Sequence, residues 1–114
     1  MPNLPKNIEK IIEKFVQELQ KILDTHLKKV ILYGSYARGD YNENSDIDIM
    51  ILTDIPVEQL YSYFTKISEI AYDLELENNI ILSPLLKNVE RFESWSDVMP
   101  FYINVIKEGA VLIG

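Results

Sequence analysis

The sequence contains no cysteine, which excludes disulfides, thiolate metal sites and cysteine nucleophiles. It also has no apolar run close to the roughly 20 residues that a membrane-spanning helix needs. Residues 1–14 carry charges throughout and lack the apolar block of a secretory signal. Because a chain without cysteine suits a reducing compartment, these absences predict a soluble cytoplasmic protein that does not associate with membranes.

Basic residues are also few, since 11 Lys and Arg against 18 Asp and Glu give a formal net charge of -7. An acidic surface repels phosphate backbones, so direct binding to DNA or RNA is disfavoured. The charge leaves room for a local basic patch, a basic protein partner, or a metal–nucleotide complex held by carboxylates. The only histidine is His26, which we interpret as an exposed residue or a cation at a helix end rather than an acid–base catalyst.

The length and composition predict one compact domain over residues 1–114, because 47% of the residues are hydrophobic and no repeat interrupts them. Segments whose apolar residues recur every three or four positions, which is typical of helices, alternate along the chain with short continuous apolar runs, which are typical of strands. This pattern predicts helices over residues 7–27, 35–38, 56–78, 89–95 and 100–108, and strands over residues 30–33, 47–52, 80–86 and 110–113. Pro84 would either weaken the later half of its strand or place that strand at a sheet edge. The simplest fold class is α/β (α+β), a small two-layer sandwich in which a mixed sheet packs against helices.

Two aspartates open the second predicted strand. Side chains alternate along a strand, so Asp46 and Asp48 point to one side while Ile47 points to the core. Mg²⁺ prefers hard oxygen ligands and takes one or two carboxylates, with water and substrate phosphates completing its shell. The alternative is that both are simply solvent-facing residues. However, aspartate is disfavoured in strands and like charges on one face repel, which favours a bound cation.

A turn of small residues follows the first predicted strand. Gly34 lets the backbone come close to a ligand, and Ser35 would open a short helix whose N–H groups and hydroxyl suit a phosphate. Arg38 lies one turn further and can donate two parallel hydrogen bonds to a phosphate. The alternative for Arg38 is a surface ion pair with Glu43 or Asp40.

The arrangement of Gly34-Ser35, ten residues, and Asp46-Ile47-Asp48 resembles the signature of the DNA polymerase β-like nucleotidyltransferase superfamily. Residues 33–39 and 45–48 are especially similar to the minimal nucleotidyltransferase (MNT) domains. The resemblance implies the nucleotidyltransferase fold and an adenylyltransferase-like enzyme that uses Mg²⁺ with ATP as substrate. It further implies that Asp46 and Asp48 are the catalytic, metal-binding residues. The nucleotide-binding residues would be Gly34, Ser35 and Arg38.

The resemblance also implies a partner. Many MNT proteins are antitoxins of toxin–antitoxin systems, paired with a HEPN-domain ribonuclease toxin, and such members silence the toxin by transferring AMP from ATP to one of its tyrosines. A chain of 114 residues leaves little room for an acceptor-binding domain, so we expect a nucleoside monophosphate to move to a hydroxyl on a partner protein. A homo-oligomer stays open, as does the alternative of a non-catalytic antitoxin or nucleotide-binding module that neutralises its partner by binding.

One part of the pattern is missing from this sequence. The superfamily has a third catalytic carboxylate on a later strand, and by order that strand is residues 80–86, where Ser83 occupies the expected position. Serine is a poor metal ligand and no base at neutral pH. Glu75 and Glu77 are expected to be solvated charges at the end of the preceding helix. The third acid is therefore absent or supplied from elsewhere.

Overall fold

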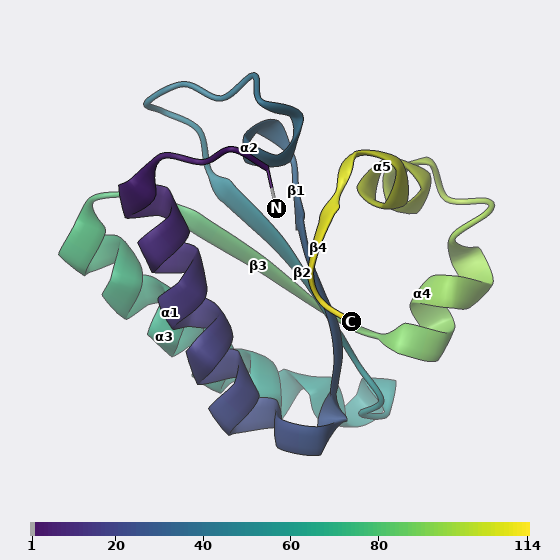
Figure 1. Ribbon diagram of the computed structural model, residues 1–114. Helices are drawn as coiled ribbons and strands as arrows, with labels where there is room; N and C mark the ends of the chain where they lie inside the picture. Colours follow the sequence, from purple (N-terminus) through teal and green to yellow (C-terminus); the bar gives the residue numbers. More distant parts are fainter. Residues whose placement is uncertain (1) are drawn as a thin grey trace.

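A computed structural model describes residues 2–114 (Figure 1). Its centre is a four-stranded mixed sheet with the order β3-β2-β1-β4. The strands are β1 (Leu27–Tyr33), β2 (Ile47–Thr53), β3 (Leu82–Asn88) and β4 (Ala110–Ile113). Strand β1 runs antiparallel to both of its neighbours, whereas β2 and β3 are parallel. The predicted α/β class with a mixed sheet is confirmed.

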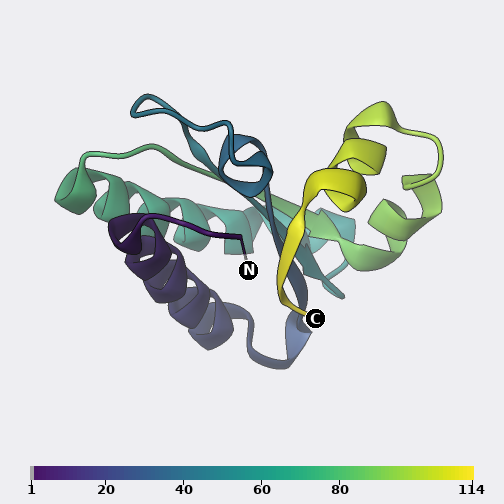
Figure 2. The same cartoon turned by 45° about the horizontal axis from the view of Figure 1, so that its top comes forward.

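The helices cover the sheet from two sides, as Figures 1 and 2 show. They are α1 (Lys6–Leu23), α2 (Ser35–Arg38), α3 (Leu60–Asn78), α4 (Val89–Trp95) and α5 (Pro100–Glu108), with 3₁₀ turns η1 (Asp24–His26) and η2 (Val57–Gln59). Helices α1 and α3 lie together on one face, and α4 and α5 lie on the other side. Across residues 2–114, every helix is too short or too polar to cross a bilayer.

Strand β2 is buried on both faces, which explains why helices gather on two sides. Ile47, Ile49 and Ile51 belong to the main core with residues of α1 and α3. Met50 and Leu52 point the other way, into a smaller cluster with residues of α4 and α5. A central strand of this kind reads as a continuous apolar run. The α4–α5 pair thus adds a partial third layer to the two layers expected from the sequence.

Several element boundaries differ from the sequence-based prediction. The helix expected from residue 56 begins instead at Leu60, after the 3₁₀ turn η2. Helix α1 ends at Leu23, because Asp24 adopts a positive φ of 49° that does not continue the helix. Leu27 therefore lies on β1, where it pairs with Thr53 of β2, and not in the last helical turn. Strand β3 is displaced by two residues because its parallel register with β2 begins at Leu82. Pro84 lies in β3, which is an edge strand, the second of the two predicted alternatives.

Candidate active site

The end of β1 and the start of β2 lie side by side. Tyr33 pairs with Asp48 across the antiparallel register, so the turn that follows Tyr33 lies directly beside the aspartates. Helix α2 begins at Ser35. The backbone N–H of Arg38 donates to the Gly34 carbonyl at 3.0 Å, and this hydrogen bond holds the helix to the turn. The sheet register therefore brings the two halves of the sequence pattern to one place.

Only glycine fits at position 34, for reasons of both backbone conformation and space. It adopts φ 77° and ψ -158°, a region that is essentially restricted to glycine. A Cβ atom at this position would also collide with the carboxylate oxygen Oδ2 of Asp48. The missing side chain thus leaves the space in which the Asp48 carboxylate lies.

Asp46 and Asp48 form a pair of carboxylates on one side of the chain. Ile47 between them is fully buried on the opposite side, whereas both aspartates are partly exposed. Partial burial raises the pKa of Asp48, and the negative charge of Asp46 raises that pKa further, whereas Arg38 lowers it. These surroundings penalise the ionised form of Asp48, and a nearby cation would remove the penalty.

The donor set of this pair fits a magnesium ion. Two carboxylates are the number of protein ligands that Mg²⁺ usually takes, since it keeps several water molecules and binds substrate phosphates. Within residues 2–114, no group of three or more His, Cys, Asp or Glu side chains is placed to hold a metal ion. Asp46 and Asp48 would therefore be the protein ligands, and water and a substrate phosphate would complete the shell.

Arg38 lies next to the pair and carries two hydrogen bonds. Its Nε donates to Oδ2 of Asp40 at 3.2 Å, and its Nη1 donates to Oε2 of Glu108 at 3.1 Å. The Asp40 contact is one of the two ion pairs considered from the sequence. Glu108 lies 70 residues away in the chain, and no local sequence signal pointed to it. A guanidinium has five N–H donors, so these two bonds leave others for a ligand.

Comparison with known proteins identifies the family to which this arrangement belongs. A family model described as "Nucleotidyltransferase domain" matches residues 9–113. The chain belongs to the nucleotidyltransferase domain family. A relative from Methanocaldococcus jannaschii, named "Putative protein adenylyltransferase MJ0604", is 38% identical over 109 residues, which cover 93% of this chain and 98% of the relative. The predicted family and the predicted class of enzyme, a nucleotidyltransferase, are confirmed.

Solved structures share the fold of this nucleotidyltransferase domain. A "putative nucleotidyltransferase" from Sulfolobus solfataricus aligns with a TM-score of 0.61 and 21% identity, over 97% of this chain and 89% of its own. A toxin-antitoxin crystallised with AMP-PNP aligns with a TM-score of 0.59 and 24% identity, over 90% of this chain and 73% of its own. At these identities the likeness concerns the fold alone.

The residue expected from the sequence at the position of the third carboxylate, Ser83, lies on β3. Ser83 pairs with Asp48 in the parallel register of β2 and β3, so it lies directly beside the acid pair. The acids at the end of α3 serve elsewhere. Oε1 of Glu75 accepts the backbone N–H of Leu82 at 2.9 Å, and Glu77 lies 3.8 Å from the exposed Lys14. Neither glutamate supplies a third ligand to the pair.

Tyr33, which pairs with Asp48, also contacts α5, and the sequence did not reveal this contact. The ring of Tyr33 meets that of Phe101 edge to face, with centroids 5.6 Å apart. Burial raises the pKa of Tyr33 to about 12, and the charge of Asp48 contributes. Its phenol is therefore neutral at physiological pH. The only available signal was the position of Tyr33 immediately before Gly34, because the partner in α5 is distant in sequence.

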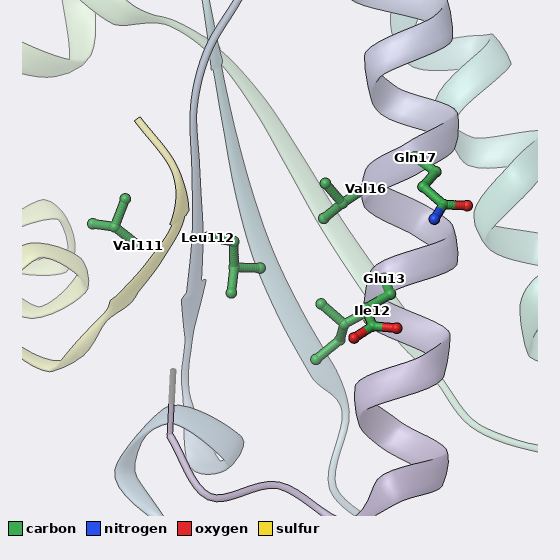
Figure 3. Close-up of a pocket in the computed structure, with 6 residues that line it drawn as sticks. All are labelled: Ile12, Glu13, Val16, Gln17, Val111 and Leu112. Carbon is green, nitrogen blue, oxygen red and sulfur yellow. The ribbon is translucent and has the colours of Figure 1, made fainter.

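A hollow elsewhere on the domain has different chemistry. It lies between α1 and β4, measures about 300 Å³ and is lined by Ile12, Glu13, Val16, Gln17, Val111 and Leu112 (Figure 3). The hollow shares no lining residue with the aspartate pair, and apolar side chains dominate it. Convergent polar groups rather than the size of a cavity therefore mark the candidate site.

Proposed function

We propose that this protein is a Mg²⁺-dependent nucleotidyltransferase that transfers AMP from ATP to a hydroxyl of a partner protein, and that the partner is a HEPN-domain toxin silenced by the transfer. The observation that carries the proposal is the Asp46–Asp48 pair held against the Gly34–Ser35 turn by the pairing of β1 with β2. The name of the M. jannaschii relative and the toxin-antitoxin with AMP-PNP support the choice of donor and partner. An ATP-dependent antitoxin would act in the cytoplasm.

Each residue of the site would have a separate task. Asp46 and Asp48 would hold Mg²⁺, which when bound offsets the negative charge of the phosphates. The first N–H groups of a helix lack partners within that helix, so the backbone at Ser35 can donate to a phosphate, as can its hydroxyl. The donors of Arg38 that do not engage Asp40 or Glu108 would contact the triphosphate and fix its orientation.

In the proposed reaction, the acceptor hydroxyl oxygen attacks the α-phosphorus of ATP. The bond from the α-phosphorus to the bridging oxygen of the β-phosphate breaks, pyrophosphate leaves with that oxygen, and the hydroxyl loses its proton. Because Ser83 occupies the place next to Asp48, this chain offers no third carboxylate as base there. We assign the base to the partner or to solvent, and the partial exposure of both aspartates leaves the site open to such a molecule.

The test is intact-mass analysis of a co-purified partner after incubation with ATP and Mg²⁺. The proposal predicts that the partner gains the mass of AMP, that label from α-labelled ATP enters it, and that a metal chelator prevents both. An unchanged partner mass despite neutralised toxicity would contradict the enzymatic proposal.

Such a result would instead support a second function, that of a non-catalytic antitoxin or nucleotide-binding module. The observation in its favour is Ser83 beside Asp48, because a site with two carboxylates can hold a metal nucleotide without a residue to accept the proton. Calorimetry separates these possibilities further. Binding of Mg²⁺ and ATP without transfer indicates a nucleotide-binding module, whereas absence of ATP binding indicates neutralisation by protein contact alone.

A further inference from the structure

An ion pair joins α2 beside the site to the far end of the chain. Arg38 is the last residue of α2, and its Nη1 donates at 3.1 Å to Glu108, the last residue of α5. Both side chains are partly exposed, at 42% for Arg38 and 34% for Glu108. Asp40 accepts a second bond from the same guanidinium, through Nε. The guanidinium is thus held by carboxylates from two separate segments.

The position of Glu108 is fixed by packed elements rather than by a loose loop. Val105, one turn earlier in α5, is buried in the smaller core cluster. Immediately after Glu108, Gly109 is packed so closely that an added Cβ would collide with the carbonyl of Val105 and with Ile31 of β1. Strand β4 then pairs with β1, with Ala110 opposite Leu32. The same strand that carries the Gly34 turn therefore also anchors the end of α5.

Holding Arg38 matters because a free arginine samples many rotamers, and ordering it on a phosphate costs conformational entropy. A guanidinium that is already oriented by two carboxylates loses less freedom when a ligand binds. Its remaining N–H donors are then available at the site beside Asp48.

We propose that Glu108 is a positioning residue for nucleotide binding: its carboxylate accepts the hydrogen bond from Nη1 of Arg38 and holds the guanidinium toward the triphosphate. This inference rests on the proposed function, because it takes Mg²⁺ and ATP as the ligand. Glu108 itself touches no substrate and acts through Arg38. Its charge alone would have the opposite effect, since a nearby carboxylate repels an anionic nucleotide.

Two substitutions separate the hydrogen bond from the charge. Glu108→Gln and Glu108→Ala remove the same charge, but only glutamine retains an oxygen that accepts from Arg38. Affinity for AMP-PNP in the presence of Mg²⁺ is measured by titration calorimetry on the full chain, with thermal unfolding to verify folding. We expect Glu108→Ala to weaken binding about 3- to 10-fold, the range of one net hydrogen bond, and Glu108→Gln to stay within about 2-fold of the parent.

The same pair of substitutions is then made in an Arg38→Ala background, where neither should weaken binding and the two should no longer differ, because the residue that the hydrogen bond acts through is gone. Glu90→Ala, which removes an exposed acid of α4, is the matched control for charge. With Arg38 present, tighter binding by Glu108→Ala or equal effects of alanine and glutamine would overturn the positioning role, as would a weakening by alanine that persists without Arg38. Absence of nucleotide binding by the parent chain would instead overturn the proposed function.

Discussion

Strand β2 has an aspartate near each end, and the two have opposite surroundings. Asp48, near the start, lies partly buried beside the like charge of Asp46, and its pKa is raised. Asp54 directly follows the end of the strand, where its carboxylate lies 2.7 Å from Nδ1 of His26 and 3.5 Å from Nζ of Lys28. The hydrogen bond from His26 is the main cause of its lowered pKa.

The difference separates a carboxylate with a structural role from one that is available for function. At Asp54 the chain itself provides a hydrogen-bond partner, His26, and a cation, Lys28, and the backbone N–H of Asp54 also donates to the His26 carbonyl at 3.2 Å. At Asp48 the nearby cation is Arg38, which already binds two other carboxylates. Charge that the fold leaves uncompensated in a partly buried position is a general mark of a functional site. The predictions below test this contrast.

The largest effect is expected from removing both site aspartates. The double substitution Asp46→Ala and Asp48→Ala should lower the rate of AMP transfer to a co-purified partner by about 100-fold or more, because metal-based charge stabilisation contributes several kcal/mol. The measurement is incorporation of label from α-labelled ATP. Thermal stability should be unchanged or higher, since two repelling charges are removed.

The matched control for this double variant is Asp54→Ala, which removes a carboxylate from the other end of the same strand. It should retain transfer at the parent rate. Labelling of the partner by the double variant at the parent rate would show that the metal-binding assignment is wrong and that the contrast between the two ends has no functional meaning.

The next effect concerns the glycine that accommodates Asp48. Gly34→Ala should lower the free energy of unfolding by about 3 kcal/mol or more, because it combines a glycine-only backbone conformation with a collision against the carboxylate. Gly39→Ala is the comparison, since Gly39 has φ 90° but nothing within 4 Å of an added Cβ. It should cost only about 1–2 kcal/mol.

Urea denaturation of both variants measures these free energies. In addition, Gly34→Ala should lose Mg²⁺-dependent nucleotide binding while it remains folded, because its new methyl group displaces Asp48. Equal destabilisation by the two alanines would mean that the carboxylate is not confined against Gly34.

The local features of the site could be predicted from the sequence, whereas the surroundings of Asp54 were not predicted. Gly34-Ser35 and the alternation of Asp46, Ile47 and Asp48 predicted a turn and a same-sided pair, and these patterns depend on few neighbouring residues. The four strands followed from short apolar runs for the same reason. The pairing of β1 with β2 then brings the turn and the aspartate pair together.

Contacts that span the chain were beyond sequence reasoning. Glu108 reaches Arg38 over 70 residues, and Phe101 reaches Tyr33 because α5 packs back onto β1. The end of α1 was misplaced because the helical spacing of apolar residues continues to Leu27, whereas pairing with Thr53 draws Leu27 into β1. Tertiary pairing of this kind outweighs local periodicity.

A smaller effect should appear in the pH dependence of stability. The raised pKa of Asp48 means that the folded state holds its proton to higher pH than the unfolded state, so the stability contribution of Asp48 falls as pH rises from the ordinary aspartate pKa through the raised value. Asp48→Asn should therefore be more stable than the parent at neutral pH, and this advantage should disappear in acid below that window. Thermal unfolding across pH measures it.

Adding Mg²⁺ and AMP-PNP to the same thermal unfolding experiment tests whether Asp48 takes part in binding the metal nucleotide. At neutral pH, Mg²⁺ with AMP-PNP should raise the melting temperature of the parent chain, because a ligand that binds only the folded state stabilises it. Asp48→Asn should gain much less from the same addition. An equal gain in both proteins would place the metal nucleotide elsewhere on the domain.

The smallest effect is expected at the other end of β2, with the opposite sign. The lowered pKa of Asp54 contributes stability that is present above the ordinary aspartate pKa and is lost as pH falls through the folded value. Asp54→Asn should thus lower the melting temperature slightly at neutral pH, less so at high salt, because the group is exposed and screened. The loss should fade in acid, and nucleotide affinity should stay at the parent value. If Asp54→Asn instead stabilised the protein as Asp48→Asn is expected to, then His26 and Lys28 would not compensate its charge, and the two ends of β2 would not differ in the way the structure indicates.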